Sequence, residues 1–201
     1  MSIDFLSPDC SGKTYCEYST PACLEILEYP RFGINDGTPR MPAFVVINNE
    51  QAWDLTVENP NRRQVRFKAI DFCVNIFRTG SYNLNNDERT AQEFSSDEVS
   101  SSRGGQIKRC EGMLIIDNEQ FLFIEIKKAI YGSWLKDARE KFEESILSFK
   151  EHHPGLQNGI LKPIIANRLL IRTHQNEMVQ KKILKEKIGV DFQVRSTYQI
   201  V

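Results

Sequence analysis

Two apolar segments joined by a short polar one constrain the fold of this chain more than any other feature. The segments are residues 108–116 and 121–127, and Asp-Asn-Glu-Gln lies between them at 117–120. Their length and composition are typical of buried strands, and Asp and Asn in a short connection favour a turn. We therefore predict that residues 108–127 form a buried β-hairpin.

Charged residues interrupt this apolar hairpin. Glu125 and Lys127 are one residue apart, so both point to the same face of the second strand. Pairing of the two strands brings Glu111 close to them. Burying a charged side chain costs several kcal/mol unless it is paired or has a functional role. The common alternative explanation for Glu125 and Lys127 is a solvent-exposed salt bridge at the edge of the sheet. We predict that Glu111, Glu125 and Lys127 form one polar site.

An acid on one strand followed by acid-x-Lys on the next resembles the signature of the PD-(D/E)XK nuclease superfamily, the restriction-endonuclease-like fold. Glu111, Glu125 and Lys127 match it, with glutamate where the family usually has aspartate and without the Pro-Asp pair. The stretch 108–126 is also similar to a subgroup of small bacterial proteins. The resemblance implies Mg²⁺, or Mn²⁺, bound by the two acids and a water oriented by Lys127.

The same resemblance implies a further acid on the first core helix, for which Asp71 is the candidate and Glu93 and Glu98 are alternatives. It also implies a metal-dependent nuclease that cuts phosphodiester bonds. The expected substrate is DNA, with RNA as the alternative, and the expected context is restriction or defence. Many such nucleases act as homodimers, which stays open for this chain.

The chain divides into an N-terminal extension at 1–62 and a core at 63–201, and its 201 residues suit one globular domain. The extension is rich in Pro, Gly and Asn and has one strand candidate at 43–47. Phe67, Ile70, Val74 and Phe77 predict an amphipathic helix over 65–77. The polar stretch 78–105 reads as an exposed loop or flap.

The second half of the core alternates helices and strands. A helix is predicted from Ser133 to about residue 152, with Trp134, Leu135, Ala138, Phe142, Ile146 and Phe149 inward and Lys136, Asp137, Glu140, Lys141 and Glu144 outward. A strand at 164–172, a helix at 178–188 and a strand at 192–201 follow. The order predicts an α/β (α+β) fold with a central mixed sheet flanked by helices, as in the superfamily's core.

The net charge of −1 means that any nucleic acid must bind to a local basic patch. Arg168, Arg172 and Lys181 are the candidates for phosphate contacts, and solvated helix charge is the alternative. The N-terminus does not resemble a signal peptide and no segment is long enough to span a membrane, so we expect a cytoplasmic protein.

Five cysteines lack the tight spacing of a zinc knuckle and read as free thiols. A small metal-binding or regulatory protein built on Cys10, Cys16 and Cys23 is a third hypothesis. The main rival to the nuclease keeps the fold without the chemistry. In that reading a catalytically degenerate domain binds nucleic acid or another protein, which the glutamate at 111 and the neutral net charge favour.

Overall fold

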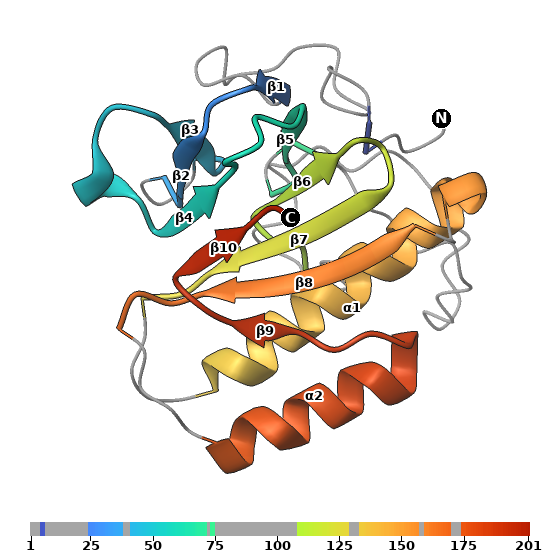
Figure 1. Ribbon diagram of the computed structural model, residues 1–201. Helices are drawn as coiled ribbons and strands as arrows, with labels where there is room; N and C mark the ends of the chain where they lie inside the picture. The colour runs from blue at the N-terminus through green and yellow to red at the C-terminus, as the bar shows by residue number, and fades with distance from the viewer. Residues whose placement is uncertain are drawn as a thin grey trace.

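The computed structural model describes residues 5–6, 24–37, 41–71, 73–74, 108–128, 133–156, 159–169 and 174–201. Its elements form three layers, which are a small sheet, a large sheet and a pair of helices (Figure 1). The large sheet is the middle layer, so both of its faces are covered. Consecutive apolar residues suit such a sheet, and this is the composition of residues 113–116 and 121–124. The α+β class predicted from the sequence is confirmed.

The large sheet has six strands in the order β1-β5-β6-β7-β8-β9. Their bounds are β1 (Leu24–Leu27), β5 (Val65–Ala69), β6 (Gly112–Ile116), β7 (Gln120–Ile126), β8 (Ile160–Ala166) and β9 (Gln193–Val194). The first four are antiparallel neighbours, whereas β8 is parallel to β7 and β9 is parallel to β8. The predicted hairpin is confirmed as β6 and β7.

Both helices lie on one face of the large sheet. The first, α1 (Trp134–His152), connects β7 to β8, and the second, α2 (His174–Ile188), connects β8 to β9 (Figure 1). Parallel neighbours need such crossover connections. Phe149 of α1 is fully buried in the layer between α1 and the sheet, where its ring contacts those of Phe121 and Phe123 of β7.

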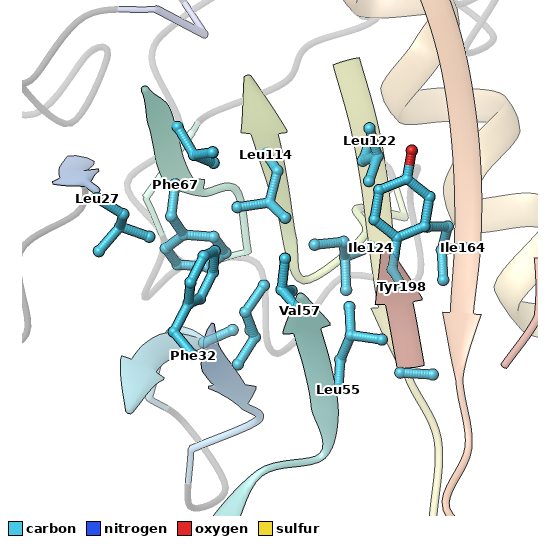
Figure 2. Packing of buried hydrophobic residues seen from close by; sticks show 14 of the residues in the cluster. Leu27, Phe32, Leu55, Val57, Phe67, Leu114, Leu122, Ile124, Ile164 and Tyr198 are labelled. Atoms are coloured by element: carbon cyan, nitrogen blue, oxygen red, sulfur yellow. The ribbon is translucent and has the colours of Figure 1, made fainter. Parts of the chain in front are cut away.

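The small sheet covers the other face. It has the order β10-β4-β2-β3 and combines β2 (Arg31–Asn35), β3 (Phe44–Val46) and β4 (Leu55–Glu58) with the C-terminal β10 (Thr197–Gln199). A short 3-10 helix, η1 (Glu50–Ala52), precedes β4, and another, η3 (Pro154–Leu156), follows α1. Phe32, Val57 and Tyr198 of this sheet pack on Phe67, Leu114, Leu122, Ile124 and Ile164 of the large one (Figure 2).

The turn between β6 and β7 has the backbone of a tight hairpin. Asp117 and Asn118 have φ values of 49° and 62°, and the Glu119 amide donates to the Ile116 carbonyl oxygen. Positive φ at two consecutive positions is typical of a type I′ turn, for which Asp and Asn are among the preferred residues. This turn fixes the register that places Gly112 opposite Ile124.

Several boundaries differ from those predicted, including that of α2, which begins at His174 instead of residue 178. The helix predicted over 65–77 is wrong, because residues 65–69 form β5. There Val65, Phe67 and Ala69 alternate with Arg66 and Lys68, and this period of two outweighs the helical spacing of Phe67, Ile70 and Val74. Residues 192–201 form two short strands in different sheets instead of one. The strand β8 begins and ends earlier than predicted, and the polar stretch 78–105 lies outside the described residues.

Neither helix of the described residues combines the length and the apolar composition that a membrane crossing requires.

Candidate active site

The carboxylates of Glu111 and Glu125 meet where β6 begins and β7 ends. Gly112 pairs with Ile124, so in an antiparallel pair the preceding residue, Glu111, lies opposite Glu125. The side chain of Glu125 is fully buried and Glu111 is 7% exposed. The sequence-based prediction that these two acids converge therefore agrees with the geometry.

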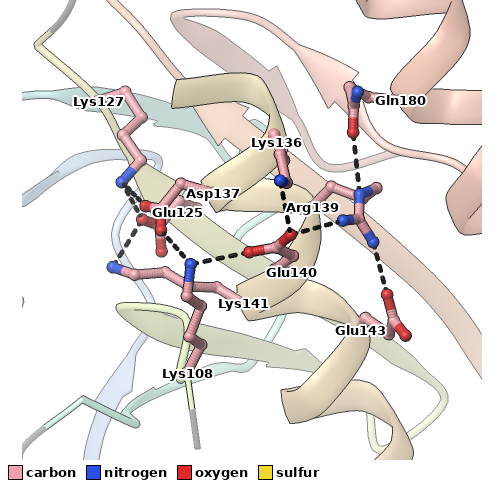
Figure 3. A network of polar contacts seen from close by, with 10 residues as sticks. All are labelled: Lys108, Glu125, Lys127, Lys136, Asp137, Arg139, Glu140, Lys141, Glu143 and Gln180. Carbon is pink, nitrogen blue, oxygen red and sulfur yellow. Dashed lines mark hydrogen bonds and ion pairs between the residues drawn. The ribbon is translucent and has the colours of Figure 1, made fainter. Parts of the chain in front are cut away.

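Two lysines contact this pair of acids. Glu125 Oε1 lies 2.8 Å from Lys127 Nζ and 2.8 Å from Lys141 Nζ (Figure 3). Lys141 Nζ is also 3.1 Å from Glu111 Oε1. Lys127 follows β7, as predicted, whereas Lys141 comes from α1. The site is therefore built between the large sheet and α1.

An outer set of charges holds Lys127 in place. Asp137 Oδ2 lies 2.8 Å from Lys127 Nζ, and Asp137 Oδ1 lies 2.9 Å from Lys108 Nζ (Figure 3). Lys108 also contacts Glu140 at 2.8 Å. Partial burial raises the pKa of Asp137, but hydrogen bonds from Lys127 and Lys108 outweigh this effect and lower that pKa to about 2. Asp137 is thus an anion at neutral pH and a fixed partner for the Lys127 ammonium.

The pKa values of the two glutamates are raised. Burial, followed by the charge of Glu125, raises the pKa of Glu111 to about 8. Burial also raises the pKa of Glu125, against the opposing charges of Lys141 and Lys127. Burial lowers the pKa of each lysine, but the glutamate charges outweigh it and raise the pKa of both Lys127 and Lys141. The site therefore favours the protonated form of both its lysines and of both its glutamates.

We expect Glu111→Gln to flatten the pH dependence of stability. Between pH 4.5, where unfolded glutamate ionises, and about 8, the folded protein keeps a proton that the unfolded chain loses. Wild-type stability should therefore fall as pH rises through this window. At pH 8 Glu111→Gln should be more stable than wild type by about 1–3 kcal/mol. This gain is smaller than the free energy that corresponds to the full pKa shift, because Lys141 loses a charged partner in the variant. Urea unfolding across the window measures this, and equal slopes for the two proteins would contradict it.

Asp71 lies beside the site but not on a helix. It follows β5, its amide donates to the Glu111 carbonyl oxygen, and its Oδ1 is 3.3 Å from Arg109 Nη2. Its negative charge contributes to the raised pKa values of Glu111 and Lys141. Asp71 is thus a peripheral acid of the site, held by Arg109. Glu93 and Glu98, the alternatives to it, lie outside the described residues.

The sequence-based reading missed Lys141, Asp137 and Asp36. Lys141 and Asp137 were assigned to the outer face of the helix, yet both contact the site. A usable signal was present, because Lys141 is two helical turns after Trp134 and therefore shares its side of α1. Asp36 follows β2 of the small sheet, and its charge contributes to the raised pKa of Glu111. The N-terminal strands thus bring a further acid towards the site.

Lys128 faces away from Lys127, as expected for consecutive strand positions. Its Nζ lies 3.0 Å from Asp54 Oδ2, just before β4 of the small sheet, whereas Lys127 contacts α1. Of these two consecutive lysines, Lys127 is therefore the one that contacts Glu125.

The proposed phosphate-binding residues are dispersed. Arg168 follows β8, which is parallel to β7, so it lies at the end of the sheet where β7 also finishes. It is exposed and donates to the Gln51 carbonyl oxygen at 2.8 Å. Lys181 of α2 pairs with Glu177 at 2.7 Å and lies over the Phe192 ring. Arg172 lies outside the described residues. Of the three, Arg168 is placed at the same end of the sheet as the glutamates.

Of the cysteines that the structure describes, Cys110 lies beside the site, directly before Glu111. Cys73 and Cys110 are both buried, and burial raises the pKa of Cys110. The Cys110 amide donates to Ser145 Oγ at 3.0 Å, which ties the start of the hairpin to α1. Cys10, Cys16 and Cys23 lie outside the described residues.

The donor atoms that could hold a divalent cation are the two glutamate carboxylates. Within the described part of the chain, no three His, Cys, Asp or Glu side chains gather as a ready ligand set. Glu125 Oε2 is nevertheless buried without a hydrogen-bond partner among the same residues. Mg²⁺ is commonly held by one or two carboxylates, substrate phosphate and water, so this pair fits it.

Comparison with known proteins adds no assignment to this geometry. No protein-family model, curated protein or solved structure matches the chain.

Proposed function

We propose that this protein is a Mg²⁺-dependent nuclease with a restriction-endonuclease-like core, and that it hydrolyses phosphodiester bonds in DNA. The arrangement of the core supports the proposal. An antiparallel hairpin carries Glu111 and Glu125, α1 crosses over, and β8 returns parallel to β7. From the hairpin onwards this is the order that the resemblance to the PD-(D/E)XK superfamily implies, whereas the first core helix expected over 65–77 is replaced by β5 at residues 65–69. A role in restriction or defence follows from that resemblance alone.

One observation carries the proposal. Two nearly buried carboxylates from neighbouring strands face each other, with a lysine ammonium 2.8 Å from one of them. A structural salt bridge needs only one acid and one base, whereas here two acids are buried together with two lysines, which is costly. Such a cost is expected where two carboxylates must hold one hard cation, and strained electrostatics of this kind cluster at functional sites.

The protein side chains have separate roles in this proposal. Glu111 and Glu125 bind the metal, which supplies Lewis-acid activation of the phosphate and of a bound water. Lys127 is protonated, so it acts as a hydrogen-bond donor that orients the water and stabilises charge on the phosphate. Asp137 positions Lys127 by its contact at 2.8 Å. Lys108 in turn fixes Asp137.

Cleavage of plasmid DNA with Mg²⁺ or Mn²⁺ tests the proposal, and Lys127→Met and Lys128→Met form a matched pair. We expect Lys127→Met to lower the cleavage rate by about 10²-fold or more, because one electrostatic donor is lost. Lys128→Met should stay near the wild-type rate, since Lys128 contacts Asp54 on the opposite face. Clean wild-type protein that cuts neither DNA nor RNA, or equal rates for both variants, would contradict the assignment.

A second candidate is a binding module on the same fold. It is favoured by the contacts of the site, in which Lys127 and Lys141 already pair with the glutamate carboxyl groups. In that case the four side chains form a structural ion-pair network. DNA binding that is independent of divalent metal, without cleavage and insensitive to Lys127→Met, would favour this candidate over the nuclease.

A further inference from the structure

Lys141 occupies the position between the two carboxylates that a bound divalent cation would need. Its Nζ lies 2.8 Å from Glu125 Oε1 (Figure 3) and 3.1 Å from Glu111 Oε1, so one ammonium bridges the two carboxylates. A divalent ion held by the same oxygens would lie within a few ångströms of that ammonium. Two cations at this separation repel each other strongly in a site shielded from water.

We propose that Lys141 is an internal counter-ion of the metal-free protein and that its ammonium leaves the carboxylates when a divalent cation binds. This inference rests on the proposed metal site. In this inference Lys141 of α1, which lies outside the strand motif, controls the affinity of that site for a divalent cation.

Geometry explains why Lys141 moves and Lys127 stays. Lys127 has a second carboxylate partner in Asp137, which Lys108 also holds. The ion pairs of Lys141 within the described residues both go to the proposed metal ligands. Its side chain is 19% exposed, and a lysine has a flexible four-carbon stem, so the ammonium has a route towards solvent. The negative charge of Asp71 also favours the Lys141 ammonium.

The energetic consequence is a competition. Without the Lys141 charge, Glu111 and Glu125 lack the cation that bridges them, and binding of a divalent ion relieves their repulsion. With Lys141 present, the same ion must first displace an established pair of contacts. Lys141 therefore weakens metal binding while it stabilises the metal-free fold.

Isothermal titration of Mn²⁺ into wild type, Lys141→Met and the control Lys136→Met at fixed ionic strength tests the competition. Lys136 is on the same helix but is exposed and contacts Glu140. We expect Lys141→Met to lower the Kd for Mn²⁺ at least tenfold, and Lys136→Met to leave it unchanged. A Kd for Lys141→Met that is equal to or higher than that of wild type, including no binding by either, would overturn the inference.

A measurement on the wild-type protein does not depend on the variant folding. Amine acetylation followed by peptide mass spectrometry reports how available each lysine is. Saturating Mg²⁺ should increase the acetylation rate of Lys141 severalfold over KCl of equal ionic strength and leave Lys136 unchanged. A Lys141 rate that stays constant or falls would overturn the inference.

The outcomes separate this inference from the nuclease proposal. Tighter Mn²⁺ binding by Lys141→Met in a protein that never cleaves nucleic acid would support the counter-ion role and refute the nuclease. Cleavage by wild type together with unchanged Mn²⁺ affinity in Lys141→Met would support the nuclease and refute the counter-ion role.

Discussion

Glu125→Gln is expected to reduce metal-dependent cleavage by about 10³-fold, equivalent to about 4 kcal/mol of transition-state stabilisation. The substitution keeps the shape of a fully buried side chain but removes the charge that faces Lys127, Lys141 and the proposed metal. A neutral amide is a much weaker ligand for a hard cation than a carboxylate. Initial rates of plasmid cleavage at saturating Mg²⁺ measure the effect.

Glu119→Gln is the matched control for this prediction. Glu119 carries the same charge in the same hairpin, but it lies exposed in the turn at the opposite end of β7. We expect it to cleave at the wild-type rate. A folded Glu125→Gln protein, verified by circular dichroism, that cleaves as fast as Glu119→Gln would show that Glu125 is not required for the reaction.

Phe149→Ala is expected to lower the free energy of unfolding by about 3–5 kcal/mol. Phe149 is fully buried, and its ring centroid is 4.9 Å from that of Phe121 and 5.5 Å from that of Phe123. It also contacts the ring of Phe5 at 5.6 Å. The substitution leaves a cavity between α1 and β7 that rigid neighbouring rings fill only partly. Because typical domains are stable by about 5–15 kcal/mol, this is a large fraction of the total.

Leu147→Ala on the same helix is the control for Phe149→Ala. Leu147 is 46% exposed, so its truncation removes little buried surface and should cost about 0.5 kcal/mol. Urea unfolding followed by circular dichroism compares the two variants with wild type. A loss below about 1.5 kcal/mol for Phe149→Ala would mean that α1 is not anchored to β7 through this ring.

The hairpin and its three charges were predictable from the sequence because strand periodicity is local. Apolar residues on both faces of β6 and β7 identify a covered sheet, and alternation alone places Glu125 and Lys127 on one face. Pairing across a short turn then places Glu111 opposite Glu125. These inferences use only residues of the same hairpin, which are close together in sequence.

Features that depend on distant contacts were not predictable in the same way. The segment 65–69 has both strand and helix spacing, and only its pairing with β1 and β6 selects the strand. The C-terminal β10 pairs with β4 of the N-terminal region, although about 140 residues separate them in sequence. No local pattern indicates such a partner.

Helical periodicity also misassigned the two site residues on α1. An amphipathic pattern divides a helix into an apolar stripe and a polar face, and it places every charge on the latter. Asp137 and Lys141 lie on the flank of the stripe, and the flank is turned towards the charged end of β7. The spacing from Trp134 indicates the side of α1 on which Lys141 lies, but α1 itself does not reveal that the sheet beneath it offers an acid as a partner.

A crystal structure of the protein soaked in Mn²⁺, with anomalous scattering to locate the ion, tests the metal site most directly. We expect one strong anomalous peak about 2.0–2.3 Å from a carboxylate oxygen of both Glu111 and Glu125, with the Lys141 ammonium turned away from them. Saturating Mn²⁺ that leaves Lys141 bridging the two glutamates, with no peak between them, would contradict the assignment.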